Sequence, residues 1–132
     1  MTRFVITPDV ALAIARGEVV VAGEHQLVAP ALIRSQVLSL LYEAVRRGEV
    51  ATADAERQLD VIRGLRMRLL GDRVLQRVAW RLADQLGWPD TFDAEYVALT
   101  QLQADALVTL DPEMADAVKG LVTVAPVTAL ST

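Results

Sequence analysis

The chain has 132 residues, of which 53% are hydrophobic and 5% aromatic, and its formal net charge is −4. That length predicts one domain, residues 1–132, with a core built mainly from Leu, Val and Ala. The absence of cysteine excludes disulfides and thiolate metal sites and fits a reducing compartment. No apolar run is long enough to span a membrane, and no signal peptide is recognisable, so we expect a cytoplasmic protein without membrane contacts.

The first half of the chain predicts one strand and three helices. The strand covers residues 3–7, and the helices cover residues 8–17, from Pro30 or Ala31 to about Arg47, and from 52 to about 63. Pro8 and Gly17 are typical of the start and the end of a helix. Thr52 is a good N-cap for the third helix.

The second half alternates strands with helices. The strands cover residues 66–70, 105–110 and 121–126, and the helices cover residues 71–88, 90–103 and 111–120. Such alternation predicts βαβ units with helices on both faces of a parallel sheet. We therefore expect an α/β fold, a three-layer α/β/α sandwich with a central parallel sheet. Val5, Val108 and Val122 should lie in neighbouring buried strands.

Basic and acidic residues are separated along the chain. Between Asp84 and Asp116 there are eight acids and no Lys or Arg. Nine of the thirteen basic residues lie just before them: Arg46, Arg47, Arg57, Arg63, Arg66, Arg68, Arg73, Arg77 and Arg81. This arrangement suits a protein that binds phosphates beside a metal. A solvated helical face gives the same counts, so charge alone does not decide.

Two aspartates and a threonine are placed to meet at one edge of the predicted sheet. Thr7 and Asp111 follow strands, and Asp93 lies in the first turn of a helix. Ligands of open parallel sheets bind beyond the carboxyl ends of the strands. Mg²⁺ and Mn²⁺ prefer oxygen ligands of this kind. The competing interpretation is two helix starts, since Asp111-Pro112 is a good cap and an acid at Asp93 favours the helix dipole.

Several segments resemble the PIN-domain family, and within it the VapC-type toxins of toxin–antitoxin pairs. The resemblance covers nearly the whole chain and is most specific in "DAEYVALTQLQADALVTLD", residues 93–111. The other segments are "FVIT", "LVAPALIRSQVLSLL" and "LVTVAP". The resemblance implies a PIN-like sandwich and a Mg²⁺- or Mn²⁺-dependent endoribonuclease. It also implies a homodimer and a small antitoxin whose tail fills the active-site groove.

The family's site contains four acids, and this chain has acids at two of the matching positions. Asp93 and Asp111 match as catalytic, metal-binding residues. The other two positions fall on Thr7 and Gln36, which offer neutral oxygens. The loss of two negative charges predicts weaker cation binding. Asp9 is a candidate substitute ligand, and Glu95 or Asp90 could contribute from the other side.

Three functions therefore compete, of which the third is a purely structural partner-binding domain with no nucleic-acid role. The first is a PIN-type ribonuclease toxin whose Arg34, Arg66, Arg68 and Arg73 contact the RNA backbone. The second is a catalytically impaired PIN-like module that binds RNA or a protein partner through the same groove. The high apolar content favours a homodimer, an antitoxin-like partner, or both. We interpret His25 as a surface residue, and Trp80 and Trp88 as packing residues rather than base-stacking platforms.

Overall fold

The computed structural model describes all 132 residues and contains one four-stranded parallel sheet. The strand order is β3-β2-β1-β4. Its strands are β1 (Arg3–Ile6), β2 (Gln26–Pro30), β3 (Met67–Leu70) and β4 (Ala106–Val108). Val5 of β1 pairs with Val28 on one side and with Leu107 on the other. The predicted α/β fold with a central parallel sheet is confirmed.

Six α-helices and one 3-10 helix surround the sheet. They are α1 (Pro8–Ala15), α2 (Ile33–Arg46), α3 (Thr52–Arg63), α4 (Arg73–Leu86), α5 (Phe92–Gln103), α6 (Pro112–Val118) and η1 (Val127–Ser131). Local sequence signals set several of their ends. Asp72 caps α4 by accepting a hydrogen bond from the amide of Leu75 at 2.8 Å, and Gly87 ends α4 in the left-handed conformation.

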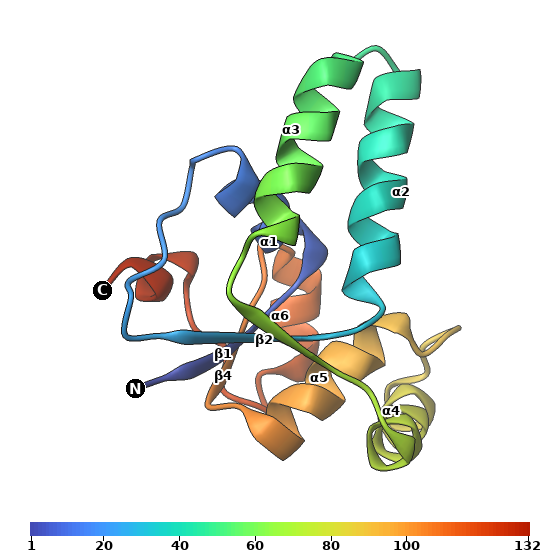
Figure 1. Cartoon of the computed structure of the whole chain (residues 1–132). Helices are drawn as coiled ribbons and strands as arrows, with labels where there is room; N and C mark the ends of the chain where they lie inside the picture. The colour runs from blue at the N-terminus through green and yellow to red at the C-terminus, as the bar shows by residue number, and fades with distance from the viewer.

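The helices form two layers around the sheet (Figure 1). Helices α1, α2 and α3 pack on one another, and α2 and α3 form an antiparallel pair that extends beyond the sheet. Helix α5 packs on β1, β2 and β4, and α4 packs against α5. Tyr96 of α5 is the largest fully buried side chain. None of the helices combines the length and the apolar composition that crossing a lipid bilayer requires.

Three local predictions differ from the structure. The strand β2 was not predicted, because its short apolar run leads directly into Pro30 and the next helix. Thr52 is the first residue of α3, and Ala51 occupies the N-cap. The predicted last strand, residues 121–126, is reduced to one bridge between Leu107 and Val124. Val122 therefore lies outside any strand and is only half-buried. Pro126, which has no amide donor, ends the pairing before η1.

The end of the chain closes the core, which gives a stability prediction. Leu130 in η1 is fully buried, and its carbonyl accepts a hydrogen bond from the amide of Ala22 at 2.8 Å. Leu130→Ala should lower the free energy of unfolding by about 2–5 kcal/mol, because a cavity is left behind. Leu110→Ala is the control, since Leu110 is 45% exposed. Urea denaturation measures the free energy of unfolding of both variants, and equal losses would contradict the role of Leu130 in closing the core.

Candidate functional site

The candidate site lies where the strand order reverses. β2 and β3 extend the sheet on one side of β1, and β4 lies on the other. Ile6 of β1 pairs with Val108 of β4, and the amide of Thr7 donates to the carbonyl of Val108 at 3.3 Å. The carboxyl ends of both strands thus meet at Thr7. Such switch points are where open α/β sheets bind ligands.

Thr7 is buried and holds Asp9 in place. The Thr7 hydroxyl donates a hydrogen bond to Oδ1 of Asp9. The same carboxylate oxygen accepts the amide of Val10 at 2.8 Å. Only one of the two carboxylate oxygens of Asp9 is therefore engaged within the chain. The Thr7 hydroxyl has only one proton to donate, and its acceptors, Asp9 and the carbonyl of Val108, lie within the chain.

Asp93 and Asp111 come from neighbouring elements of the same edge. Asp93 lies in the first turn of α5, as predicted. Asp111 caps α6, since its Oδ1 accepts the amide of Glu113 at 3.0 Å. Partial burial raises the pKa of Asp93, and the negative charges of Asp90, Asp111 and Asp9 raise the pKa further. Asp111 therefore caps its helix and also acts electrostatically on Asp93.

Gln36 reaches the same region through a tyrosine. The hydroxyl of Tyr96 donates to Oε1 of Gln36 at 2.6 Å, which joins the first turn of α2 to α5. Burial raises the pKa of the Tyr96 phenol, and the charges of Glu95, Asp93 and Asp9 add to this effect. Tyr96 thus stays protonated and remains a donor. The sequence pattern predicts no role for Tyr96, although Tyr96 lies inside the most specific resembling segment.

The structure gathers these acids without arranging three of them around one point. No group of three or more His, Asp or Glu side chains has the geometry to hold a metal ion. The acids nevertheless lie close enough for Asp9, Asp90 and Asp111 to raise the pKa of Asp93. A cation would relieve this repulsion, whereas the engaged oxygens of Thr7 and Gln36 favour an edge that is stable without an ion. The residues present fit weak cation binding at most.

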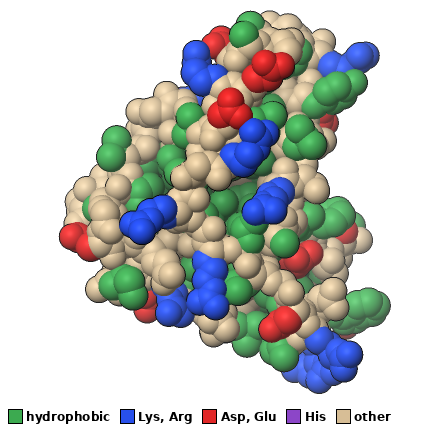
Figure 2. All heavy atoms as spheres, viewed as in Figure 1, with side chains coloured by type: hydrophobic (Ala, Val, Ile, Leu, Met, Phe, Trp, Pro, Cys, Tyr) green, Lys and Arg blue, Asp and Glu red, His purple; other side chains and the backbone are tan.

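The four arginines proposed for RNA border three different hollows. Arg66 and Arg68 line a hollow of about 530 Å³ together with residues 21–27, at the amino end of the sheet and away from the acids. Arg73 lies on α4, and Arg34 lies near the start of α2. Figure 2 shows basic side chains spread over the face in view, with hydrophobic atoms between them. Their contact with an RNA backbone stays a prediction.

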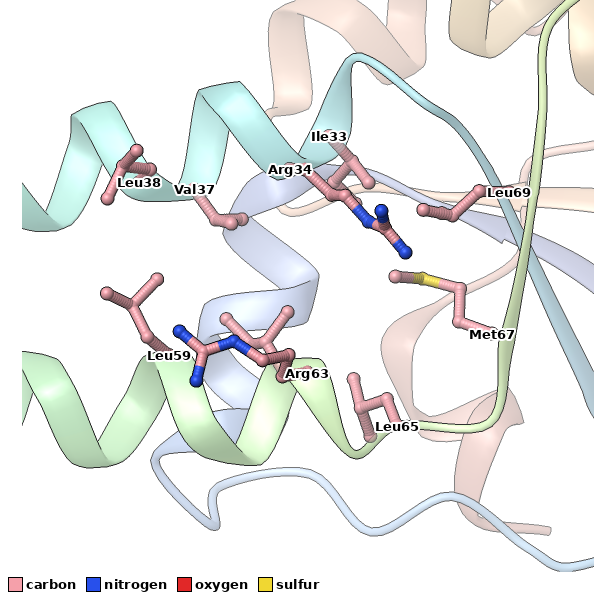
Figure 3. Close-up of a pocket in the computed structure, with 10 residues that line it drawn as sticks. Ile33, Arg34, Val37, Leu38, Leu59, Arg63, Leu65, Met67 and Leu69 are labelled. Atoms are coloured by element: carbon pink, nitrogen blue, oxygen red, sulfur yellow. The ribbon is translucent and has the colours of Figure 1, made fainter.

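Arg34 instead belongs to an apolar groove between α2, α3 and β3 (Figure 3). The groove has a volume of about 370 Å³. Val37 and Leu38 of α2 face Leu59 of α3, and Met67 and Leu69 of β3 close the far end. The guanidinium groups of Arg34 and Arg63 lie among these apolar side chains. The groove combines hydrophobic walls with positive charge.

Two further residues differ from their sequence interpretation. Trp80 was interpreted as a packing residue, but it is 72% exposed, because the buried face of α4 is formed by Leu75, Ala79 and Leu82. Helical spacing could have shown this, since Trp80 shares a face with Arg77. His25 is half-buried rather than fully exposed, and its ring meets Phe4 edge-on at 5.1 Å between centroids.

Comparison with known proteins supports the fold. No protein-family model matches the chain, and no curated protein matches it. The chain is similar to the crystal structure of PAE2754 from Pyrobaculum aerophilum, with a TM-score of 0.73 and 22% sequence identity. The match covers 98% of this chain and 93% of that chain. It establishes the fold alone.

The crowding around Asp93 can be measured by titration. NMR of the Asp93 carboxyl carbon should show a pKa above the ordinary 3.8, and Asp111→Asn should lower it by removing a like charge. Saturating Mg²⁺ should also lower it if a cation binds there. An Asp93 pKa that neither change moves would contradict this electrostatic description of the edge.

The same raised pKa has a consequence for stability. The folded protein holds the Asp93 proton more tightly than the unfolded chain does, so ionisation of Asp93 opposes folding. As the pH rises from 3.8 through the raised value, Asp93→Asn should gain stability relative to the wild type. The measurement is the pH dependence of urea denaturation for both proteins, without divalent ions.

Proposed function

We propose that this chain is a PIN-like, VapC-type endoribonuclease with a reduced divalent-cation site. The observation that carries the proposal is that Asp9, Asp93 and Asp111 come from elements that meet where β1 and β4 end, where partial burial and then neighbouring negative charges raise the pKa of Asp93. Unpaired carboxylates at a topological switch point repel one another, and a cation offsets that repulsion. The resemblance of residues 93–111 to the PIN family supplies the reaction.

Asp93 and Asp111 would hold Mg²⁺ or Mn²⁺ through their carboxylates, with Asp9 as the substitute for a missing acid. Thr7 and Gln36 would contribute neutral oxygens only, and their existing hydrogen bonds to Asp9 and Tyr96 would make that contribution weak. When bound, the ion would supply water activation and charge stabilisation at a phosphodiester. The chain's own contribution is positional: Thr7 orients Asp9, and Tyr96 fixes Gln36 between α2 and α5.

A second candidate is a PIN-like module that binds RNA or protein without cleaving RNA. The observation that favours it is that Thr7 and Gln36 are satisfied inside the protein while no three acids are arranged around an ion. Two carboxylates and neutral oxygens bind a hard divalent cation more weakly than four carboxylates. The two candidates differ in whether Asp9 completes the set.

The partner proposed with this function is a small antitoxin-like protein, and its proposed place is the groove of Figure 3. Leu38 and Leu59 offer apolar contacts to an inserted segment, and Arg34 favours an acidic side chain in that segment, whereas Arg63 is already paired with Asp60. Leu38 is 56% exposed, which leaves apolar surface to be covered. A second copy of the chain is the alternative occupant.

RNA cleavage distinguishes the two candidates. Purified protein is incubated with structured and single-stranded RNA, with Mg²⁺, with Mn²⁺, or with EDTA. If Asp9 completes the site, the wild type should cleave only with metal, and Asp9→Asn or Asp93→Asn should each reduce cleavage by about 100-fold or more, as expected for residues that act as a unit. Undiminished cleavage by both variants would contradict the proposed ligands.

If the wild type is inactive, Thr7→Asp with Gln36→Glu tests the reduced site. The new carboxylates add repulsion beside Asp9, so the metal-free variant should melt below the wild type, and Mg²⁺ should raise its Tm more. Metal-dependent cleavage should then appear, and Asp93→Asn in that background should abolish it. If Mg²⁺ does not raise the Tm of the double variant and the wild type is inactive, the second candidate, a binding module without cleavage, is the one that stands.

The groove gives a separate prediction about protein association. Leu38→Glu should abolish binding of an antitoxin-like partner or of a second copy, since it places a charge against the apolar walls. Leu102→Glu on α5 is the control, because Leu102 is 41% exposed and lies outside the groove. Light scattering and co-purification with co-expressed neighbouring proteins measure association. Equal effects of the two variants would contradict this use of the groove.

A further inference from the structure

Helix α4 presents a row of arginines with an exposed tryptophan among them. Arg73, Arg77 and Arg81 follow one another at four-residue spacing, and Trp80 lies between the last two. Together with Gln76 these residues border a shallow hollow of about 370 Å³. We call this surface the α4 stripe. It lies on the side of α4 opposite the residues that pack against the core.

The arginines of the α4 stripe are not neutralised by the protein. None of the three forms an ion pair within the chain, whereas Arg47, Arg57 and Arg63 each pair with an acid nearby. The two acids closest in sequence to these arginines, Asp72 and Asp84, do not neutralise them. Asp72 is occupied in capping α4, and Asp84, one turn beyond Arg81, makes no ion pair. Three free positive charges thus remain in a row.

We propose that the α4 stripe is a docking surface for single-stranded RNA. Four residues of helix advance by about 6 Å, so the three guanidinium groups form a regular row that can follow a phosphate backbone. The indole of Trp80 is 72% exposed and offers a face on which an unpaired base can stack. Duplex RNA keeps its bases stacked inside the helix and cannot use that face.

The composition of the α4 stripe argues against a protein as its occupant. Trp80 is the one apolar residue that borders the hollow, and the others are three arginines and a glutamine. Single Trp and Arg residues are common at protein interfaces too, but the buried centre of such an interface is depleted in charge overall, which a row of three unpaired arginines does not fit. Nucleic-acid interfaces are more polar and more positively charged. The apolar groove between α2, α3 and β3 has the opposite character, so the two surfaces suit different partners.

This docking surface goes beyond the proposed nuclease and does not depend on its cation site. Binding is therefore measured in EDTA, where metal-dependent cleavage is off. Failure of RNA binding would leave the cleavage experiment unaffected, and an inactive wild type would leave this proposal unaffected. The probe is a fluorescein-labelled single-stranded RNA of about 12 nucleotides, followed by fluorescence anisotropy. The same strand annealed to its complement is the duplex comparison.

Two variants of Trp80 test stacking. Trp80→Ala should weaken binding of the single strand by roughly 5- to 150-fold, which is the range for loss of one stacked base. Trp80→Phe should retain binding within about 3-fold, because a smaller ring still stacks. RNA should quench the tryptophan fluorescence of the wild type, and this quenching should be lost in Trp80→Phe. Unchanged affinity of Trp80→Ala would overturn the proposal.

A charge-matched pair of triple variants tests the arginine row. Arg73, Arg77 and Arg81 are changed to Gln in one protein, and the ion-paired Arg16, Arg47 and Arg57 are changed to Gln in the other. Both lose three positive charges. The α4 variant should bind RNA at least about 10-fold more weakly, and the slope of log affinity against log salt should fall by about 2. Equal losses of RNA affinity in the two triple variants would show that only the net charge matters, and would overturn the proposal.

Two more outcomes would contradict the α4 stripe as an RNA surface. One is duplex RNA binding as tightly as the single strand. The other is light scattering that shows an oligomer dissociated by Trp80→Ala while RNA affinity stays unchanged, which would make α4 a protein interface. Circular dichroism melts of all variants should match the wild type within a few degrees, because every substituted side chain is exposed.

Discussion

The parallel pairing of β1 with β4 is the constraint on which the candidate site depends. Ile6 opposite Val108 fixes where both strands end, so Thr7 and the segment that leads to Asp111 leave the sheet at the same edge. Both strands are buried on both faces, and a slip of one residue would exchange the side chains that meet the two helix layers. Burial therefore sets the register, and the register sets the position of the polar residues.

Helix α5 completes the site because one side of it must be buried. Ala94 and the residues from Tyr96 to Thr100 are buried, which leaves Asp93 and Glu95 at the margin of the packed surface. The positive end of the α5 dipole favours Asp93, while Asp90, Asp111 and Asp9 oppose its ionisation. The buried Tyr96 hydroxyl needs a partner, and Gln36 provides it. Packing of α5 thus ties the acids to α2.

Much of the fold follows from local sequence signals. Proline at the start of α1 and of α6, and glycine after α4, placed these helices within a few residues. The strand β2 was missed because a five-residue strand that ends in proline has few local signals, and its parallel partners are distant in sequence. Residues 121–126 have the composition of a strand, but strand pairing depends on tertiary contacts, which the sequence does not specify.

The sequence allows the acids of the site to be predicted, but not the hydrogen bonds between its side chains. Spacing placed Asp93 and Asp111 near strand ends, because strand ends and helix starts are visible in sequence. The bonds from Thr7 to Asp9 and from Tyr96 to Gln36 depend on side-chain geometry across 2 and 60 residues of separation. Arg34 lies on α2, Arg66 precedes β3, Arg68 lies in β3 and Arg73 begins α4, and their shared charge does not reveal these positions. Charge counts carry no information about surfaces.

The two neutral residues change what holds this edge together. A carboxylate in place of Thr7 would face Asp9 across a hydrogen-bond distance, and folding would then depend on a neutralising ion. With a hydroxyl and an amide there, the edge is satisfied by hydrogen bonds within the chain, and the remaining repulsion falls mainly on Asp93. Stability is thereby separated from cation binding. Helix α4 packs directly on α5, so the α4 stripe and Asp93 belong to one packed unit. The positively charged RNA surface and the negatively charged acids are therefore different sites that keep a fixed position relative to each other.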